Sequence, residues 1–130
     1  MSLLLLMTSP AFAQSDYRCV IQRIVTAEQA PNSILTFNER NYLGKEFTVE
    51  RNTGLMAGAL KNSYVTKPQV IDPGSKGNAF KVVTTMRLEQ GAGAGSNVYV
   101  LTINEFSSSP KKPFVFVEND EVFLGVCEHF

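Results

Sequence analysis

The chain has 130 residues, of which 44% are apolar and 18% charged, and its twelve basic side chains balance twelve acidic ones. This length provides one domain with a hydrophobic core and is short for two. The balanced charge excludes the basic field that nucleic-acid binding needs, so we expect no nucleic acid among the partners. Nine Phe and four Tyr supply the aromatic mass of a core.

The first residues predict a secretory signal peptide over 1–13. Leu3-Leu4-Leu5-Leu6-Met7 is a short apolar run, and Ser9-Pro10 breaks it. Ala11-Phe12-Ala13 then forms a small-x-small cleavage site, although no Lys or Arg precedes the run. We therefore expect a mature protein that consists of a single β domain over 14–130.

The same region of the sequence argues against a transmembrane anchor and against a lipid anchor. A transmembrane anchor needs about 20 apolar residues, and this run is far shorter, so we expect no membrane span. A lipoprotein signal places small apolar residues before its cysteine, whereas Asp16-Tyr17-Arg18 before Cys19 are charged and bulky. The expected location is periplasmic or secreted, in an oxidising compartment.

In such a compartment, two cysteines most often form one disulfide. Cys19 and Cys127 are the only cysteines, so we predict that they are joined. The bond would close a loop of roughly 108 residues, which stabilises a fold by about 4–5 kcal/mol in the chain-entropy treatment. A free redox thiol or a metal site is disfavoured, because the sequence has no Cys-x-x-Cys and only one histidine.

In chain order, the sequence alternates between apolar segments and polar or glycine-rich connections. Segments of strand character, rich in β-branched and aromatic residues, are 17–25, 34–37, 45–50, 55–60, 79–88, 97–106, 113–117 and 122–127, with a short extended piece at 69–71. The connections are 26–33, 38–44, 51–54, 62–68, 72–78, 89–96 and 107–113. No segment keeps a 3.6-residue apolar period over three turns, although a short helix could lie within 38–44 or 55–63.

These elements predict an all-β fold: an antiparallel meander of seven or eight strands, closed as a small barrel or folded as a sandwich. A disulfide between the first and last strands suits a barrel, because those strands would otherwise be edges. Phe114 and Phe116 share one face of their strand, and Val115 and Val117 share the other. Since both faces are apolar, we expect this strand to be covered on both sides.

Two motifs that could carry chemistry are interpreted as loops. Gly91-Ala92-Gly93-Ala94-Gly95-Ser96 is glycine-rich, but a β-rich run follows it where a phosphate loop needs a helix. Ser109-Pro110-Lys111-Lys112 has the Ser-x-x-Lys spacing of penicillin-recognising enzymes, but its prolines do not allow the helix that such a serine needs. We therefore predict that the chain has no catalytic residue and that the protein is not an enzyme.

The remaining candidates have structural interpretations. His129 is expected to be a surface histidine, because chain termini are usually poorly held. The three carboxylates of Glu118-Asn119-Asp120-Glu121 read as a solvated hairpin turn, since the pattern of a calcium loop is absent. Five aromatic residues are expected to fill the core rather than line a ligand cavity; they are Tyr99, Phe106, Phe114, Phe116 and Phe123. We expect no metal and no cofactor.

Because no set of catalytic residues is recognisable, the sequence favours a small exported binding protein that acts through surface loops. Inhibition of another protein would be one form of this function. The candidate binding residues lie in two turns; they are Asp72, Gly74, Ser75 and Lys76, and Gly91, Gly93 and Gly95. The expected partner is a protein or a small ligand outside the cytoplasm, and the expected state is a monomer. The alternatives are a carrier of a small apolar ligand inside a barrel, or a hydrolase with an unrecognised site.

The layout resembles that of small exported lysozyme inhibitors, which carry one cysteine in the first strand and one in the last. Here Cys19 and Cys127 occupy those positions. The Ser-Gly loop motif of those inhibitors is not found in this sequence. The resemblance is therefore one of layout, and it implies a fold rather than a function.

Overall fold

The structure, a computed structural model, describes residues 15–28, 33–91 and 95–130. The expected signal peptide, 1–13, lies outside the described residues. The elements are β1 (Tyr17–Thr26), α1 (Ser33–Tyr42), β2 (Glu46–Val49), β3 (Met56–Gly58), β4 (Gln69–Pro73), β5 (Phe80–Met86), the short 3-10 helix η1 (Leu88–Gln90), β6 (Asn97–Ile103), β7 (Lys112–Glu118) and β8 (Glu121–His129).

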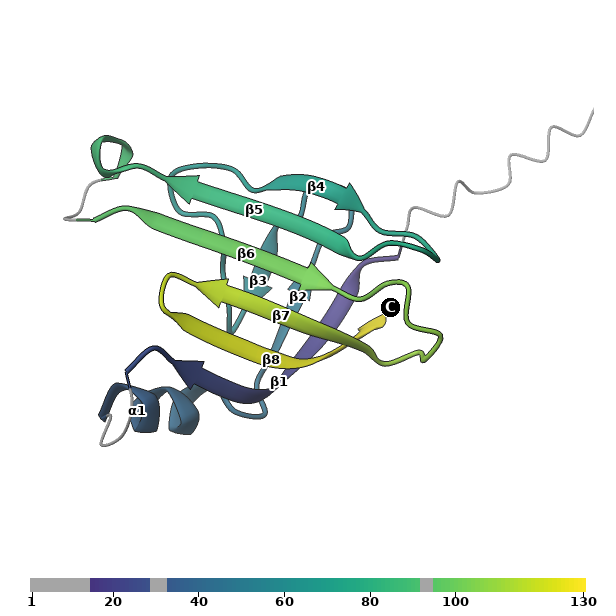
Figure 1. Cartoon of the computed structure of the whole chain (residues 1–130), viewed down its shortest axis with the longest axis horizontal. Helices are drawn as coiled ribbons and strands as arrows, with labels where there is room; N and C mark the ends of the chain where they lie inside the picture. Colours follow the sequence, from purple (N-terminus) through teal and green to yellow (C-terminus); the bar gives the residue numbers. More distant parts are fainter. Residues whose placement is uncertain (1–14, 29–32, 92–94) are drawn as a thin grey trace, which may run out of the picture.

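The eight strands form one antiparallel sheet in the order β3-β2-β1-β8-β7-β6-β5-β4. The sheet curls, so that β2 and β3 lie behind β5 to β7 in Figure 1. Because β3 and β4 do not pair with each other, the sheet is a half-barrel and not a closed barrel. The all-β antiparallel fold is confirmed, and its strands follow one another as a meander except where β8 joins β1.

The first and last strands occupy the centre of the sheet. β1 pairs with β8 over most of its length, and Cys19 lies opposite Cys127. The two cysteines form the predicted disulfide. The expectation that these strands would otherwise be edges is wrong, because β2 and β7 flank them and the edges are β3 and β4. The bond therefore reinforces a pairing that the backbone ladder already makes.

Two hairpins are formed, one by β2 and β3 and the closing one by β7 and β8. In β2 and β3, Phe47 lies opposite Gly58, and a side chain on Gly58 would approach the backbone oxygen of Glu46 to 3.0 Å, which explains the glycine there. In the closing hairpin, Glu118 lies opposite Glu121. Its turn therefore has two residues and is tighter than the four-residue turn read from the sequence.

The concave face of the half-barrel holds the core, which is filled by the sheet's own side chains. Phe47 meets Phe114 edge to face, with ring centroids 5.1 Å apart. Four of the five expected aromatic residues belong to this core, whereas Phe106 is half exposed. The convex face has no second layer among the described residues, and Val115 there is 39% exposed. The expectation that this strand is covered on both sides is therefore wrong.

The main departure from the expected fold is α1, which spans the predicted strand 34–37 and most of the predicted connection 38–44. Leu35 and Tyr42 pack against the core, and Asn38 between them is 7% exposed and donates a hydrogen bond to Glu121. A polar residue at the inward position breaks the apolar period, which is why the sequence pattern did not show a helix.

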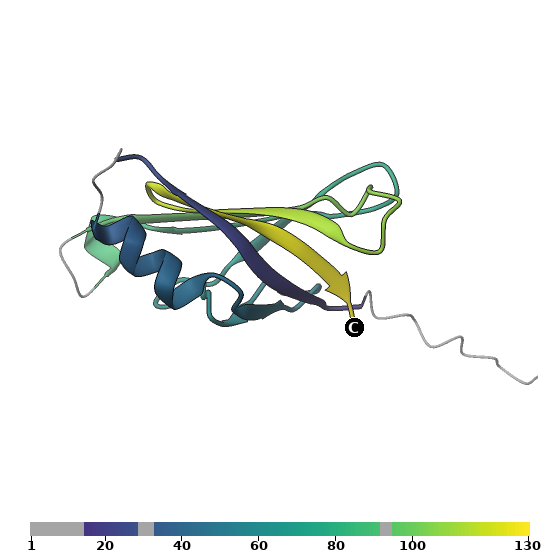
Figure 2. The same ribbon diagram turned by 90° about the horizontal axis from the view of Figure 1, so that it is seen from below.

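The strands place their connections at two ends of the half-barrel, visible in Figures 1 and 2. The end that we call the loop end carries the turns 50–55, 74–79 and 104–111, together with Ser15 and the C-terminus. The opposite end, which we call the hairpin end, carries the β7–β8 turn, η1 and α1. Lys112 begins β7 at the loop end, and Glu118 ends it at the hairpin end.

Candidate functional site

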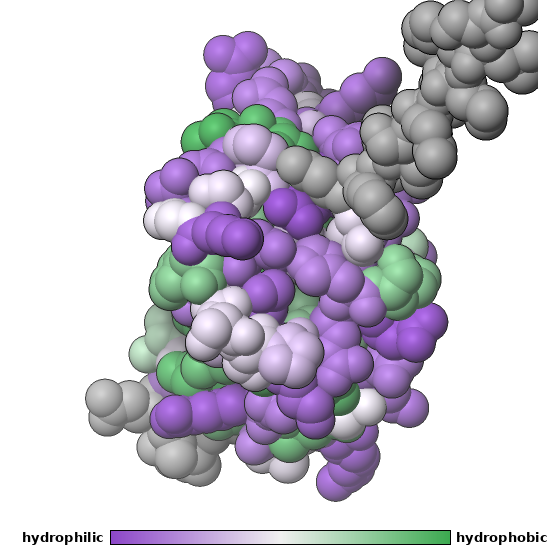
Figure 3. Space-filling model, turned by 90° about the vertical axis from the view of Figure 1, so that its right-hand side faces the viewer, coloured by the Kyte–Doolittle hydropathy of each residue, from purple (hydrophilic) through white to green (hydrophobic). Residues whose placement is uncertain are grey.

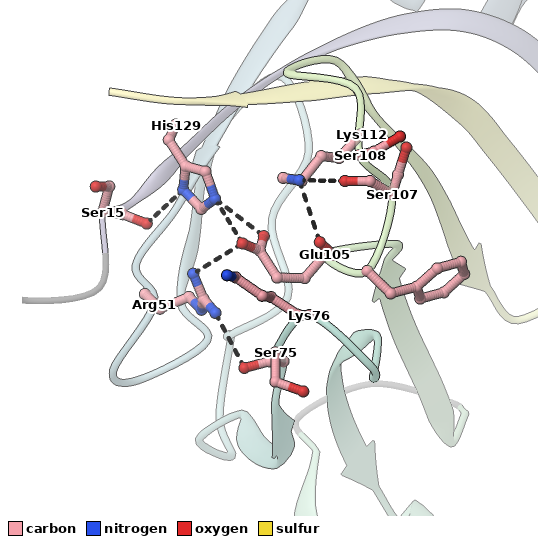
Figure 4. A pocket seen from close by; sticks show the side chains of 11 residues that line it. Ser15, Arg51, Ser75, Lys76, Glu105, Ser107, Ser108, Lys112 and His129 are labelled. Atoms are coloured by element: carbon pink, nitrogen blue, oxygen red, sulfur yellow. Dashed lines mark hydrogen bonds and ion pairs between the residues drawn. The ribbon is translucent and has the colours of Figure 1, made fainter.

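A pocket of about 780 Å³ opens at the loop end. This end of the molecule is largely hydrophilic in Figure 3. The pocket is lined by Ser15, Arg51, Gly74, Ser75, Lys76, Glu105, Phe106, Ser107, Ser108, Lys112 and His129. These residues come from three turns, from the start of β7, from the segment just before β1 and from the end of β8, and Figure 4 shows how their side chains converge.

Glu105, two residues beyond the end of β6, is the centre of this cluster. Its Oε2 accepts a hydrogen bond of 2.6 Å from the Tyr17 hydroxyl, and both of its carboxylate oxygens lie 2.9 Å from Nε2 of His129. A guanidinium nitrogen of Arg51 lies 3.9 Å from Oε1. One carboxylate thus connects the first strand, the last strand and the turn after β2. Figure 4 shows its contacts with His129 and Arg51.

The electrostatics favour a negative charge on Glu105. Burial by itself would raise the pKa of this carboxyl, but hydrogen bonds from Tyr17 and His129, and the charges of His129 and Arg51, outweigh burial and leave the pKa below its ordinary value. The pKa of Tyr17 is raised, first by burial and then by its hydrogen bond to Glu105. Tyr17 therefore stays a neutral donor, and Glu105 stays a charged acceptor.

His129 lies at the surface, as expected, but it is firmly held there. Its Nδ1 is 3.0 Å from the backbone oxygen of Ser15, its Nε2 faces Glu105, and its ring lies 4.6 Å from the ring of Tyr17. Both ring nitrogens therefore face oxygen atoms of the protein itself.

Arg51 is the residue that fixes the floor of the pocket, and it is only 5% exposed. Its Nε donates to the oxygen of Pro73 at 2.8 Å, and a terminal nitrogen donates to the oxygen of Gly74 at 3.3 Å. Its guanidinium also stacks over the ring of Tyr17. This role could not be predicted from sequence pattern, since the residue stands in an ordinary turn.

Two lysines border the same pocket in different states. The ammonium of Lys112 donates to the backbone oxygens of Glu105 and Ser107 at 3.1 and 2.7 Å, which folds the 104–111 loop onto β7. Lys76 makes no hydrogen bond or ion pair with any residue that the structure describes, and its side chain extends into the pocket (Figure 4). Its charge is the one available to a ligand.

The candidate binding residues read from the sequence fall into two separated groups. Gly74, Ser75 and Lys76 line the pocket, and Asp72 supports them by accepting a hydrogen bond of 2.8 Å from the amide of Gly74.

The glycine-rich group lies at the far end of β5. Gly91 and Gly95 belong to the hairpin end, and Gly93 lies outside the described residues. The two groups therefore do not share a surface, and only the first takes part in this site.

Positive charge predominates among the described residues that line the pocket. Arg51, Lys76 and Lys112 bring three fixed positive charges against the single carboxylate of Glu105. The contact between Ser15 and His129 uses the backbone oxygen of the serine, and no described serine hydroxyl bonds to the histidine. Within residues 15–28, 33–91 and 95–130, no three metal-ligating side chains come together.

No known protein family, no curated protein and no solved structure matches this chain. Over the ranges that the structure describes, no helix has the length and apolar character needed to cross a membrane.

Proposed function

We propose that this protein is an exported binding protein that recognises a partner outside the cytoplasm through the loop end of its half-barrel. The partner presents an acidic group to the pocket around Lys76. The observation that carries this proposal is the unpaired ammonium of Lys76 over a pocket whose other cations, Arg51 and Lys112, are tied to backbone oxygens. Side chains that hydrogen bonds already hold in place lose little conformational entropy on association, and this favours specific binding.

Four further features support export and binding. The disulfide between Cys19 and Cys127 is typical of oxidising compartments, and the residues before it have the pattern of a signal peptide. The concave face is filled by side chains such as Phe47, Phe80 and Phe116, which disfavours the alternative of an apolar carrier. The engaged nitrogens of His129 disfavour the alternative of a hydrolase.

The test is a pull-down with the oxidised protein as bait, followed by mass spectrometry and by titration of the recovered partner. We expect Lys76→Glu to weaken binding by about tenfold or more, because it reverses the available charge. Lys81→Glu is the matched control, since Lys81 is exposed on β5 and does not line the pocket. Binding should also weaken as salt rises.

Two outcomes would contradict the proposal. One is a partner that both charge-reversed variants bind equally well. The other is recovery of no protein partner while an apolar small molecule co-purifies, which would favour the carrier. Far-UV circular dichroism of both variants checks that the fold is kept.

A further inference from the structure

A second pocket lies at the hairpin end, separate from the site at the loop end. Its volume is about 280 Å³. The lining residues are Tyr42, Ala59, Leu60, Lys61, Tyr64 and Glu118. They come from the end of α1, the segment after β3 and the end of β7. The proposed function above makes no use of this pocket.

Its aromatic walls are held by packing. The ring of Tyr42 packs edge-on against Phe123, with centroids 5.7 Å apart. The ring of Tyr64 lies 6.2 Å from that of Tyr99, which is 6% exposed and stacks on Phe116. Tyr64 itself is 65% exposed. A large aromatic side chain that stays exposed beside a pocket is available for contact with a ligand.

The acidic group of the pocket is a carboxylate that has no partner among the described residues. Glu118 is partly buried, yet it accepts no hydrogen bond and forms no ion pair with any of the described residues. By contrast, its cross-strand neighbour Glu121 accepts a hydrogen bond from Asn38. Lys61 lines the same pocket without reaching an ion pair with Glu118. Burial, followed by the charge of Glu121, raises the pKa of Glu118.

We propose that this pocket binds an organic cation, namely the ammonium or quaternary ammonium group of a small molecule or headgroup, between Tyr42 and Tyr64 and against Glu118. Ring faces attract such cations through their quadrupole, and the carboxylate adds a full opposite charge. A cation would also relieve the repulsion between Glu118 and Glu121, which face each other across the hairpin. The small volume fits a headgroup rather than a peptide segment.

The test uses choline chloride as the probe and its neutral isostere, 3,3-dimethylbutan-1-ol, as the comparison. Because the chain has four tyrosines and no tryptophan, tyrosine fluorescence and the ring resonances in NMR report on the pocket directly. We expect saturable changes with choline, assigned to Tyr42, Tyr64 and Tyr99, and much weaker changes with the isostere. Equal responses to both compounds, or no saturation with choline, would overturn the proposal.

Two variants and a control complete the experiment. Tyr64→Ala removes an exposed ring and should leave the fold intact, and Glu118→Gln removes the charge at nearly constant shape. Each should weaken choline binding by about tenfold, from the loss of a ring face or of the carboxylate. Glu128→Gln, an exposed carboxylate near the C-terminus, should bind as the unaltered protein does. Unchanged affinity in Glu118→Gln would overturn the assignment.

A separate arm distinguishes the two sources of the cation. Phosphatidylcholine vesicles are sedimented with the unaltered protein and with Tyr64→Ala. Co-sedimentation that is lost in the variant assigns the pocket to a lipid headgroup. Choline binding without co-sedimentation assigns it to a free small molecule. The outcome of the partner-binding test at the loop end does not affect the choice between lipid headgroup and free small molecule. Lys76→Glu should leave choline binding unchanged.

Discussion

Nε2 of His129 lies 2.9 Å from both carboxylate oxygens of Glu105, and this contact joins the end of the last strand to the loop after β6. The same carboxylate accepts the hydroxyl of Tyr17 from the first strand. Three segments that are distant in sequence are thus held by one charged group. This arrangement ties the shape of the pocket to the ionisation of Glu105.

Replacing that carboxylate should destabilise the protein in a pH-dependent way. We expect Glu105→Gln to lower the free energy of unfolding by about 1–3 kcal/mol at pH 7, because it removes the negative charge that faces Arg51 and His129. The pKa of Glu105 is lowered in the fold. Its contribution is therefore present above the unfolded pKa and is lost as pH falls through the folded pKa.

Urea unfolding of both proteins at about pH 7 and about pH 3 measures this effect. The difference between them should be large at the higher pH and should shrink at the lower one. Glu39→Gln, an exposed carboxylate on α1, is the control and should follow the unaltered protein. A difference that stays constant over this range would show that the charge of Glu105 does not contribute.

Gly125→Ala should be strongly destabilising. A Cβ atom at Gly125 would lie 1.9 Å from the backbone oxygen of Val20 and 2.7 Å from a ring carbon of Phe114. Backbone cannot yield as a flexible side chain does, so we expect a loss of about 3 kcal/mol or more, measured by thermal or urea unfolding. Gly77→Ala is the matched control, because nothing lies within 4 Å of its Cβ position. Similar stability of the two variants would contradict this account.

Thr84→Val should stabilise the protein. Thr84 is 3% exposed on the concave face of β5, and its hydroxyl has no hydrogen-bond partner among the described residues. Replacing an unsatisfied buried hydroxyl by a methyl group of similar size should raise the free energy of unfolding by about 1 kcal/mol. The exposed neighbour Thr85 provides the control, and Thr85→Val should change stability by less than about 0.5 kcal/mol. A destabilised Thr84→Val variant would indicate a partner for the hydroxyl in solution.

Removing the disulfide should weaken the fold without changing its strand pairing. The double variant Cys19→Ala, Cys127→Ala should lose up to about 4–5 kcal/mol, the chain-entropy value for a loop of this length. Circular dichroism should remain that of a β protein, because the ladder between β1 and β8 persists. For the unaltered protein, intact mass should rise on reduction by two hydrogens. No mass change, or equal unfolding midpoints before and after reduction, would contradict the prediction.

The strands that could be predicted from the sequence are those in which local pattern and burial agree. Segment 79–88 corresponds to β5 and segment 97–106 to β6, and both alternate between the core and the outside. The helix could not be predicted, because Asn38 occupies its inward position and is satisfied only by a glutamate far along the chain. A long-range hydrogen bond stabilises Asn38 in this buried position, and a local hydrophobic pattern does not reveal such a bond.

The candidate site was predictable only in part. The turn with Ser75 and Lys76 was found, because clusters of Gly, Pro, Asp and Ser mark exposed loops. The central group was not found, since Arg51, Glu105 and His129 come from three distant segments and share no spacing motif. Tyr17 and Glu105, which are hydrogen-bonded, are 88 residues apart. Only the curl of the sheet brings such residues to one end.

The closeness of Ser15 and Asp16 to the C-terminal residues has a practical consequence. The amide of Phe130 donates to the backbone oxygen of Asp16 at 3.2 Å, and Ser15 and His129 both border the loop-end pocket. The segment from residue 15 to residue 130 therefore begins and ends at the same side of the molecule. A purification tag or a surface tether placed at the C-terminus would crowd the proposed binding face. Immobilisation through an engineered cysteine in the turn at Asp120, on the opposite end, would leave that face clear.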